Sequence, residues 1–341
     1  ETASVYNTMP FCNRVKTWYL ITVMNKKPVL VSGIKPTGDL HIGNYFGAMR
    51  QLAELSATNK YKCFIFVADY HALNTMQDAE EMKRRTRELV MAYLAVGLDP
   101  KEVIFFKQSD VPAHTELAWI FDTITTMPYL MRAHAYKDAE ARSKEISVGT
   151  FNYPMLMAAD ILLYDADVVP VGADQKQHIE YARDTAEKFN RVFKTEIFKL
   201  PEPYILPEVA VVPGTDGQKM SKSYSNVIPL FASCDELAKT VMSIVTDSSG
   251  ERPENVFQIH KLVRSENELE TVYKENRGNY KALKEILIED LDRYFAPMRA
   301  KYEDLASSSD IVDEVLIKGE REARAISEAK MERVRVAIGV S

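Results

Sequence analysis

The sequence predicts an α/β protein with a doubly wound parallel sheet, followed by a C-terminal all-helical domain. Two observations support this prediction. Up to about residue 171, short apolar runs alternate with amphipathic helical stretches, a pattern typical of a parallel sheet covered by helices on both faces. From about residue 226 onward, apolar residues recur at helical spacing and strand signals fade.

Each predicted strand is a buried run that is followed by a helix. Strands are expected at 29–31, 63–68, 103–106 and 168–171, and helices at 43–57, 78–96, 113–126, 155–163 and 174–190. In such Rossmann-like sheets, ligands bind beyond the carboxyl ends of the strands, where the strand order reverses. Gly33 and Gly172 both follow a strand at that edge.

The same pattern divides the chain into three parts. Residues 1–27 are expected to be a poorly ordered extension, residues 28–225 the Rossmann-like domain, and residues 226–341 the helical domain. The last helix, at about 310–338, carries alternating charges that indicate a solvated face. It is a candidate for packing back onto the first domain.

Composition limits the kinds of protein that this chain can be. The 341 residues carry a formal net charge of −6, with 27% charged and 46% hydrophobic residues, which argues against a generally basic nucleic-acid binder but allows a local basic stripe. The cluster of Lys83, Arg84, Arg85 and Arg87 fits a solvated helix face better than a phosphate contact. Three cysteines without metal-ligand spacing indicate a reduced, cytoplasmic setting, and no apolar run is long enough for a membrane span.

Two short segments, far apart in the chain, have the features of one nucleotide site. Residues 32–44 place a strand end, a turn and a His-x-Gly-Asn helix start in a row, which suits backbone amides and an imidazole facing phosphates. Residues 216–223 place two lysines on a glycine-flanked loop, which suits a mobile clamp for the same phosphates. The turn consists of Lys35, Pro36 and Thr37, and the loop includes Lys219, Met220, Ser221, Lys222 and Ser223.

These segments resemble the HIGH and KMSKS signatures of class I aminoacyl-tRNA synthetases. Residues 153–164, 169–180 and 245–248 make the chain similar to the bacterial tryptophanyl-tRNA synthetase family. The resemblance implies that L-tryptophan is attached to tRNA(Trp) through a tryptophanyl-adenylate, with release of AMP and pyrophosphate. ATP would enter as a substrate with Mg²⁺ held mainly by its phosphates, and no protein-bound cofactor or metal site is expected. The resemblance also implies a homodimer and a helical domain that reads the anticodon.

In adenylate formation, negative charge builds on the leaving pyrophosphate, so fixed donors and cations lower the barrier. We expect His41 and Asn44 to meet the phosphate oxygens, while Gly43 allows the nucleotide to approach closely. Lys219 and Lys222 would bring positive charge to the β- and γ-phosphates. The signature's last histidine is replaced by Asn44, as is common in this family, whereas Lys35 stands where many members have Gln.

The expected amino-acid pocket centres on one helix face, where Tyr153, Met157 and Asp160 recur at i, i+4 and i+7. Indole has one N–H donor and no acceptor, so it needs apolar walls and a single acceptor. Met157, Val169 and Val171 would supply the walls and Asp160 the acceptor. Related tyrosyl enzymes typically carry Gln in place of Met157, so this position should discriminate between the two substrates.

The resemblance assigns the remaining contacts. Tyr153 and Gln175 are candidates for the substrate ammonium group, and His71 would line the pocket, although a structural histidine fits nearly as well. The ATP contacts after the fourth strand are Gly172, Ala173 and Asp174, with Asp174 on the ribose.

Three alternatives stay open at this point. A tyrosyl-tRNA synthetase would share most of the site. A small-molecule adenylyltransferase would share the first segment, but the complete lysine loop and the helical domain argue against it. A non-catalytic RNA-binding relative would be expected to lose parts of the phosphate-binding set, all of which is present.

Overall fold

The sheet is parallel and has five strands in the order β3-β2-β1-β4-β5. The computed structural model describes residues 27–141, 145–171, 176–205, 212–246 and 252–340. The strands are β1 (Val29–Ile34), β2 (Lys62–Val67), β3 (Val103–Lys107), β4 (Val168–Val171) and β5 (Glu202–Ile205). Since the order reverses between β1 and β4, the site expected of a doubly wound sheet lies beyond these two strands. The predicted fold class is confirmed.

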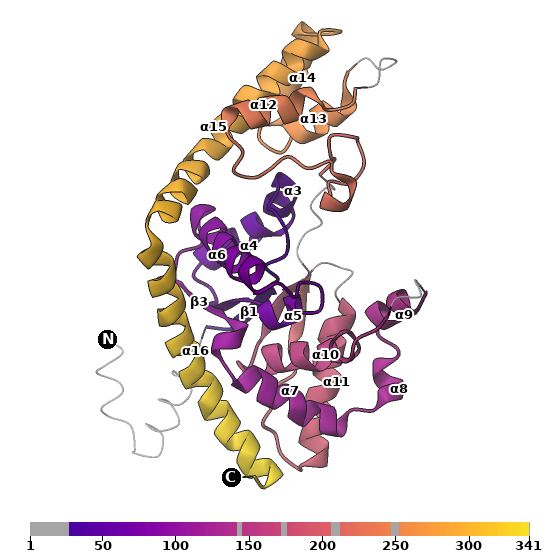
Figure 1. Cartoon of the computed structure of the whole chain (residues 1–341), viewed down its shortest axis with the longest axis vertical. Coiled ribbons are helices and arrows are strands. Elements are labelled where there is room, and N and C mark those ends of the chain that lie inside the picture. Colours follow the sequence, from indigo (N-terminus) through magenta and orange to yellow (C-terminus); the bar gives the residue numbers. More distant parts are fainter. Residues whose placement is uncertain (1–26, 142–144, 172–175, 206–211, 247–251, 341) are drawn as a thin grey trace, which may run out of the picture.

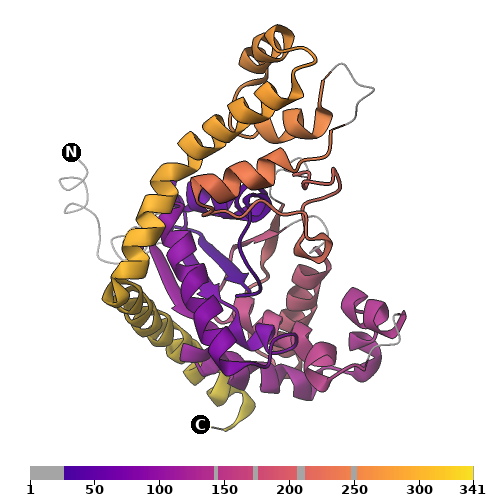
Figure 2. The same ribbon diagram turned by 45° about the horizontal axis from the view of Figure 1, so that its top comes forward.

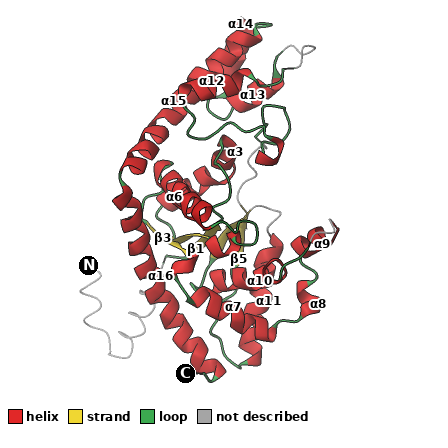
Figure 3. Cartoon of the chain, viewed as in Figure 1, coloured by secondary structure: helices red, strands yellow, loops and turns green. Residues whose placement is uncertain are grey.

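Helices surround the strands on both faces (Figure 3). In the first domain they are α3 (Ile42–Asn44), a π-helical segment η1 (Tyr45–Met49), α4 (Arg50–Ala57), α5 (Asp69–Ala72), α6 (Ala79–Ala95), a 3₁₀ turn η2 (Gln108–Asp110), α7 (Ala113–Ile124), α8 (Met127–Leu130), α9 (His134–Ala141), α10 (Val148–Leu162) and α11 (Lys176–Val192). The predicted helix at 155–163 in fact begins at Val148. Ser147 caps it by accepting a hydrogen bond from the Thr150 amide at 3.1 Å.

Each central strand buries side chains on both faces. On β1, Leu30 belongs to one apolar cluster, whereas Val29 and Val31 belong to the other. On β2, Ile65 and Phe64 divide in the same way. Side chains alternate along a strand, so a continuous apolar run is what two covered faces require.

The segment beyond β5 contains the lysine loop and then the helical part, which returns to the sheet. It contains a 3₁₀ turn η4 (Lys222–Tyr224), α12 (Cys234–Met242), α13 (Glu254–His260), α14 (Glu266–Glu275), α15 (Tyr280–Ser307) and α16 (Ser309–Ile338). α15 leads from the distal helices back to the sheet domain, and α16 continues along its side, next to β3 (Figures 1 and 2). A β-carbon at Gly319 would collide with the carbonyl oxygen of Phe105. Glycine therefore lets α16 lie directly against the edge strand β3, which covers that edge.

One strand lies where the sequence shows only a proline-rich passage. β5 includes Pro203 and pairs with β4 in parallel. Because β5 is an edge strand, the missing amide of a proline is tolerated there. In the described part of the chain, no helix has the length and apolar character needed to cross a membrane.

Candidate active site

The first half of the site is the turn and helix start that follow β1. Gly38 has a φ of +70°, a left-handed conformation that favours glycine. The backbone amide of Thr37 donates to the carbonyl of Lys35 at 2.9 Å. At the start of α3, the side-chain oxygen of Asn44 accepts a hydrogen bond from the His41 amide at 3.1 Å. Asn44 therefore fixes the entry of the chain into this helix.

His41 is a buried histidine next to glycine. Its side chain is 7% exposed, and its Nδ1 has no hydrogen-bond partner among the described residues. A β-carbon at Gly43 would lie 2.9 Å from this nitrogen and 3.4 Å from Cβ of Met220. Burial, with a smaller contribution from the positive charge of Lys222, lowers the pKa of His41 to about 4. The imidazole is thus neutral at pH 7, with one polar atom available to a ligand.

The second half of the site is a short hairpin at 212–220 followed by the turn η4. The Gly214 amide donates to the Gln218 carbonyl at 2.6 Å, and the Met220 amide donates to the Val212 carbonyl at 2.9 Å. Gly217 closes the hairpin with a φ of +82°. Lys219 is exposed beside it.

Asn226 organises this loop from within. It is 1% exposed. Its Oδ1 accepts from the Ser221 amide at 2.7 Å, and its Nδ2 donates to Asp216 at 2.6 Å and to the Lys219 carbonyl at 3.2 Å. One buried amide side chain thereby fixes the backbone on both sides of the lysines.

The two halves lie in contact. The Lys222 ammonium donates to the carbonyl of Thr37 at 3.2 Å, across 185 residues of sequence. Behind it, the Ile42 amide donates to the Ile228 carbonyl at 3.0 Å, and the Leu230 amide donates to Leu40 at the same distance. Burial lowers the pKa of Lys222. Because of its contact with Thr37, Lys222 lies against the turn that is expected to bind phosphates.

The predicted amino-acid pocket lies at the same edge of the sheet. Met157 is partly buried, and Val169 on β4 is 5% exposed. The hydroxyl of Tyr153 lies 2.6 Å from Nε2 of His178, and its ring lies 6.2 Å from that of His71, centroid to centroid. The ring of Tyr153 on α10 thus lies near that of His71 on α5.

Asp160 is buried and has three hydrogen-bond partners. It is 3% exposed. Gln108 donates to its Oδ1 at 2.7 Å, His114 Nδ1 lies 2.6 Å from the same oxygen, and His71 Nε2 lies 3.0 Å from Oδ2. Burial alone would raise the pKa of Asp160, but the hydrogen bonds from His114 and His71 outweigh it and lower the pKa to about 2. The carboxylate is therefore ionised at pH 7.

Comparisons with known proteins agree with this geometry. The family model for class I tRNA synthetases (W and Y) matches residues 24–310. The chain belongs to this family. A tryptophan–tRNA ligase of Fusobacterium nucleatum subsp. nucleatum is 46% identical over 318 residues, which cover 91% of this chain and 97% of that protein.

Solved structures extend the comparison. A tryptophanyl-tRNA synthetase from Campylobacter jejuni, complexed with ADP and tryptophan, is 43% identical with a TM-score of 0.85, over 91% of this chain and 99% of that one. A tyrosyl-tRNA synthetase from Archaeoglobus fulgidus shares the fold at 22% identity, with a TM-score of 0.62 over 82% of this chain and 90% of that one. The family predicted from the two signature segments is confirmed.

Some predicted contacts of this class I synthetase lie outside the described residues. These are Gly172, Ala173, Asp174 and Gln175. Val171 is described as part of β4, but its side chain is not. Within the described ranges, no group of three His, Cys, Asp or Glu residues could hold a metal ion.

Sequence reasoning missed several residues of the site. The sequence patterns give no prediction for Gln108, His114 or Asn226. Tyr164, the partner of His114, appears only as the last residue of the segment 153–164 that resembles the family. A usable signal existed for His114, since it follows β3 by a few residues and parallel strands end at one edge. No local signal marks Asn226, because its role depends on a hairpin that forms first.

Proposed function

We propose that this synthetase joins L-tryptophan to tRNA(Trp) in two steps. Tryptophan and ATP form tryptophanyl-adenylate and pyrophosphate, and the tryptophanyl group then passes to the tRNA with release of AMP. The relatives named tryptophan–tRNA ligase, together with the pocket around Asp160, support tryptophan over tyrosine. The juxtaposed phosphate segments support this activity over a small-molecule adenylyltransferase.

The observation on which tryptophan specificity chiefly rests is the set of partners of Asp160. A carboxylate offers about four acceptor positions, and Gln108, His114 and His71 use three of them. One position remains for a single donor, which is what an indole offers. Met157, Val169 and Val171 would form the apolar walls of this site. A phenol would need a second polar partner, which Met157 does not supply.

At the phosphate end, fixed and mobile groups have different tasks. Neutral His41 and Asn44, in the short helix α3, would meet the phosphate oxygens, with Gly43 and Met220 against the nucleotide. Lys219 and Lys222 would stabilise the negative charge that develops on pyrophosphate. The turn of Lys35, Pro36 and Thr37 and the hydroxyls of Ser221 and Ser223 would complete the cradle. Mg²⁺ would enter with ATP, held mainly by its phosphates.

The remaining substrate contacts follow from the family resemblance. Gly172, Ala173 and Asp174 would bind ATP, with Asp174 on the ribose. Gln175 and Tyr153 would bind the tryptophan ammonium group, and His71 would line the pocket while holding Asp160.

The chain is also proposed to act as a cytoplasmic homodimer on tRNA. Trp119, Met127 and Met131 are 70%, 62% and 42% exposed, and large exposed apolar side chains on neighbouring helices fit a subunit interface. The helices beyond residue 226 would read the anticodon, while the acceptor end enters the pocket. The free thiols of Cys63 and Cys234 fit a reducing compartment.

Amino-acid-dependent ATP–pyrophosphate exchange tests the proposal directly. The purified protein should exchange pyrophosphate with tryptophan and Mg²⁺ and not with tyrosine. Equal exchange with both amino acids would overturn the specificity. Exchange without any amino acid would point to an adenylyltransferase of another kind.

A further inference from the structure

Arg85 on α6 differs from the other cations of its cluster. Its side chain is 12% exposed, whereas those of Arg84 and Lys83 are 49% and 75% exposed. The expectation of a uniformly solvated helix face is therefore wrong at Arg85. Tertiary contacts that the sequence does not reveal account for the difference.

These contacts join α6 to the turn of the phosphate site. The guanidinium of Arg85 forms an ion pair with Asp39, directly after Gly38. It also pairs with Glu81 at 2.7 Å and with Glu88 at 3.5 Å. The hydrogen bond from Arg85 is the largest cause of a lowered pKa at Asp39. Two glutamates of its own helix thus orient Arg85 toward the turn.

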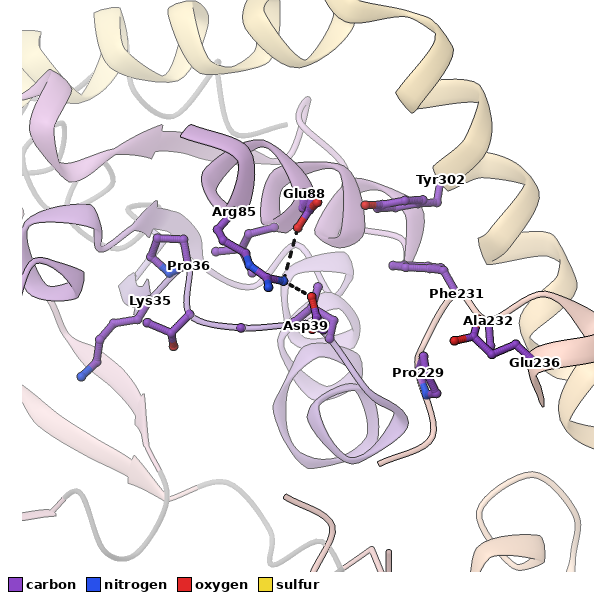
Figure 4. Close-up of a pocket in the computed structure, with 14 residues that line it drawn as sticks. Lys35, Pro36, Asp39, Arg85, Glu88, Pro229, Phe231, Ala232, Glu236 and Tyr302 are labelled. Atoms are coloured by element: carbon purple, nitrogen blue, oxygen red, sulfur yellow. Dashed lines mark hydrogen bonds and ion pairs between the residues drawn. The ribbon is translucent and has the colours of Figure 1, made fainter. Parts of the chain in front are cut away.

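A pocket of about 210 Å³ lies between this turn and the helical part. Figure 4 shows the interaction between Arg85 and Asp39 on one side of this pocket, with Phe231 and Tyr302 on the other side. These two rings stack with centroids 4.2 Å apart. An open pocket provides few van der Waals contacts to the backbone beside it. A polar anchor therefore matters more for this turn than it would in a packed loop.

The other side of the turn meets the lysine loop. Lys222 donates to Thr37, and a β-carbon at Gly38 would collide with the same lysine side chain. The turn is thus held from two directions, by Arg85 through Asp39 and by Lys222 through Thr37. Movement of Lys222 to the phosphates of ATP would break the contact to Thr37 and leave the Arg85–Asp39 pair in place.

We infer that Arg85 is a positioning residue for ATP, which it serves through Asp39 by fixing the phosphate-binding turn. This inference rests on the proposed function. Because Arg85 acts on the turn through Asp39, its replacement should lower the affinity for ATP and leave the tryptophan pocket unchanged. The expected effect of Arg85 on the affinity for ATP is modest, because the Asp39 side chain is 76% exposed and solvent screens such pairs.

The test is pyrophosphate exchange by Arg85→Gln, Asp39→Ala and the double variant. We expect the KM for ATP to rise about two- to fivefold in each single variant, with the KM for tryptophan unchanged. The double variant should be no worse than Arg85→Gln alone, since both changes remove one interaction. Arg84→Gln is the matched control, because Arg84 pairs with Glu81 and Glu88 but not with Asp39.

The outcomes separate this inference from the proposed function. Absence of tryptophan-dependent exchange in the unaltered protein would remove the function itself. An active protein in which Asp39→Ala leaves the KM for ATP unchanged would overturn the positioning role. So would equal rises in both KM values, or additive effects in the double variant. If Arg85→Gln does not fold, the exposed Asp39→Ala change still decides the question.

Discussion

Asp160 in the sheet domain and Asp290 in the helical part belong to groupings with the same chemistry. Each carboxylate meets a fully buried histidine, His114 at 2.6 Å and His260 at 2.8 Å. The far nitrogen of each histidine meets a tyrosine hydroxyl. These hydroxyls belong to Tyr164, at 2.8 Å, and Tyr273, at 3.3 Å.

The two groupings differ in the other partners of the carboxylate. Asp290 also pairs with Arg264, which follows α13, at 3.0 Å and with Arg293 on its own helix, α15, at 2.9 Å. The further partners of Asp160 are Gln108 and His71. Each carboxylate thus has three partners, but arginine cations compensate the charge of Asp290, whereas an amide and two imidazoles hold Asp160. We therefore expect a substrate donor to use the remaining acceptor position at Asp160 and none to use that at Asp290.

Replacement of the two aspartates should produce the largest contrast. In Asp160→Ala, kcat/KM for tryptophan should fall by about 100-fold or more, because an ionised hydrogen-bond partner of the substrate is lost. The KM for ATP should change less than about twofold, since the phosphate segments are untouched. Pyrophosphate exchange at varied tryptophan and varied ATP measures both values.

Asp290→Ala is the matched control for this experiment. It should lower the free energy of unfolding by about 3–5 kcal/mol, because the partners of a mostly buried carboxylate are left unpaired. The KM for tryptophan in the folded fraction should be unchanged. A similar fall in kcat/KM for tryptophan in both variants would contradict the assignment of a substrate role to Asp160 and a structural role to Asp290.

Replacement of His114 and of His260 should show the same contrast between kinetics and stability as replacement of the two aspartates, with smaller effects. In His114→Ala, the KM for tryptophan should rise about tenfold, because Asp160 loses a donor that orients it. His114→Asn should recover much of this loss, since an amide nitrogen can stand near the position of Nδ1. His260→Ala should lower thermal stability alone, as measured by differential scanning fluorimetry beside the exchange assay.

Another buried histidine, His41, has no carboxylate partner among the residues that the structure describes. Its titration should therefore contribute to the pH dependence of the stability. Its folded pKa is about 4 and its ordinary value is 6.5, so the unfolded chain binds a proton that the folded chain does not. Stability is therefore fully present above about pH 6.5 and is lost as the pH falls toward 4. By pH 5 the loss amounts to about 2 kcal/mol relative to pH 7.

The measurement is the melting temperature of the unaltered protein and of His41→Asn between pH 7 and pH 5. The unaltered protein should lose more stability over this range than the variant. Parallel curves would mean that His41 titrates normally in the folded state.

The predictable parts of the molecule are those with local signals. Apolar runs revealed β1 to β4, and the turn chemistry around Gly38 and Gly217 marked the phosphate segments. β5 was hidden because Pro203 reads as a loop until the strand is known to lie at an edge. The partners of Asp160 and the burial of Arg85 depend on which elements meet in space, and no short-range pattern encodes that.

The smallest expected contrast comes from the two tyrosines. Tyr164→Phe leaves Nε2 of His114 without its partner in a fully buried position, so kcat/KM for tryptophan should fall about two- to fivefold. Tyr273→Phe removes a longer hydrogen bond in a grouping that two arginines already hold. It should cost at most about 1 kcal/mol of stability and leave the kinetics unchanged. If Tyr164→Phe alters only the melting temperature, the hydroxyl stabilises the core without orienting Asp160, and orientation must come from Gln108 and His71.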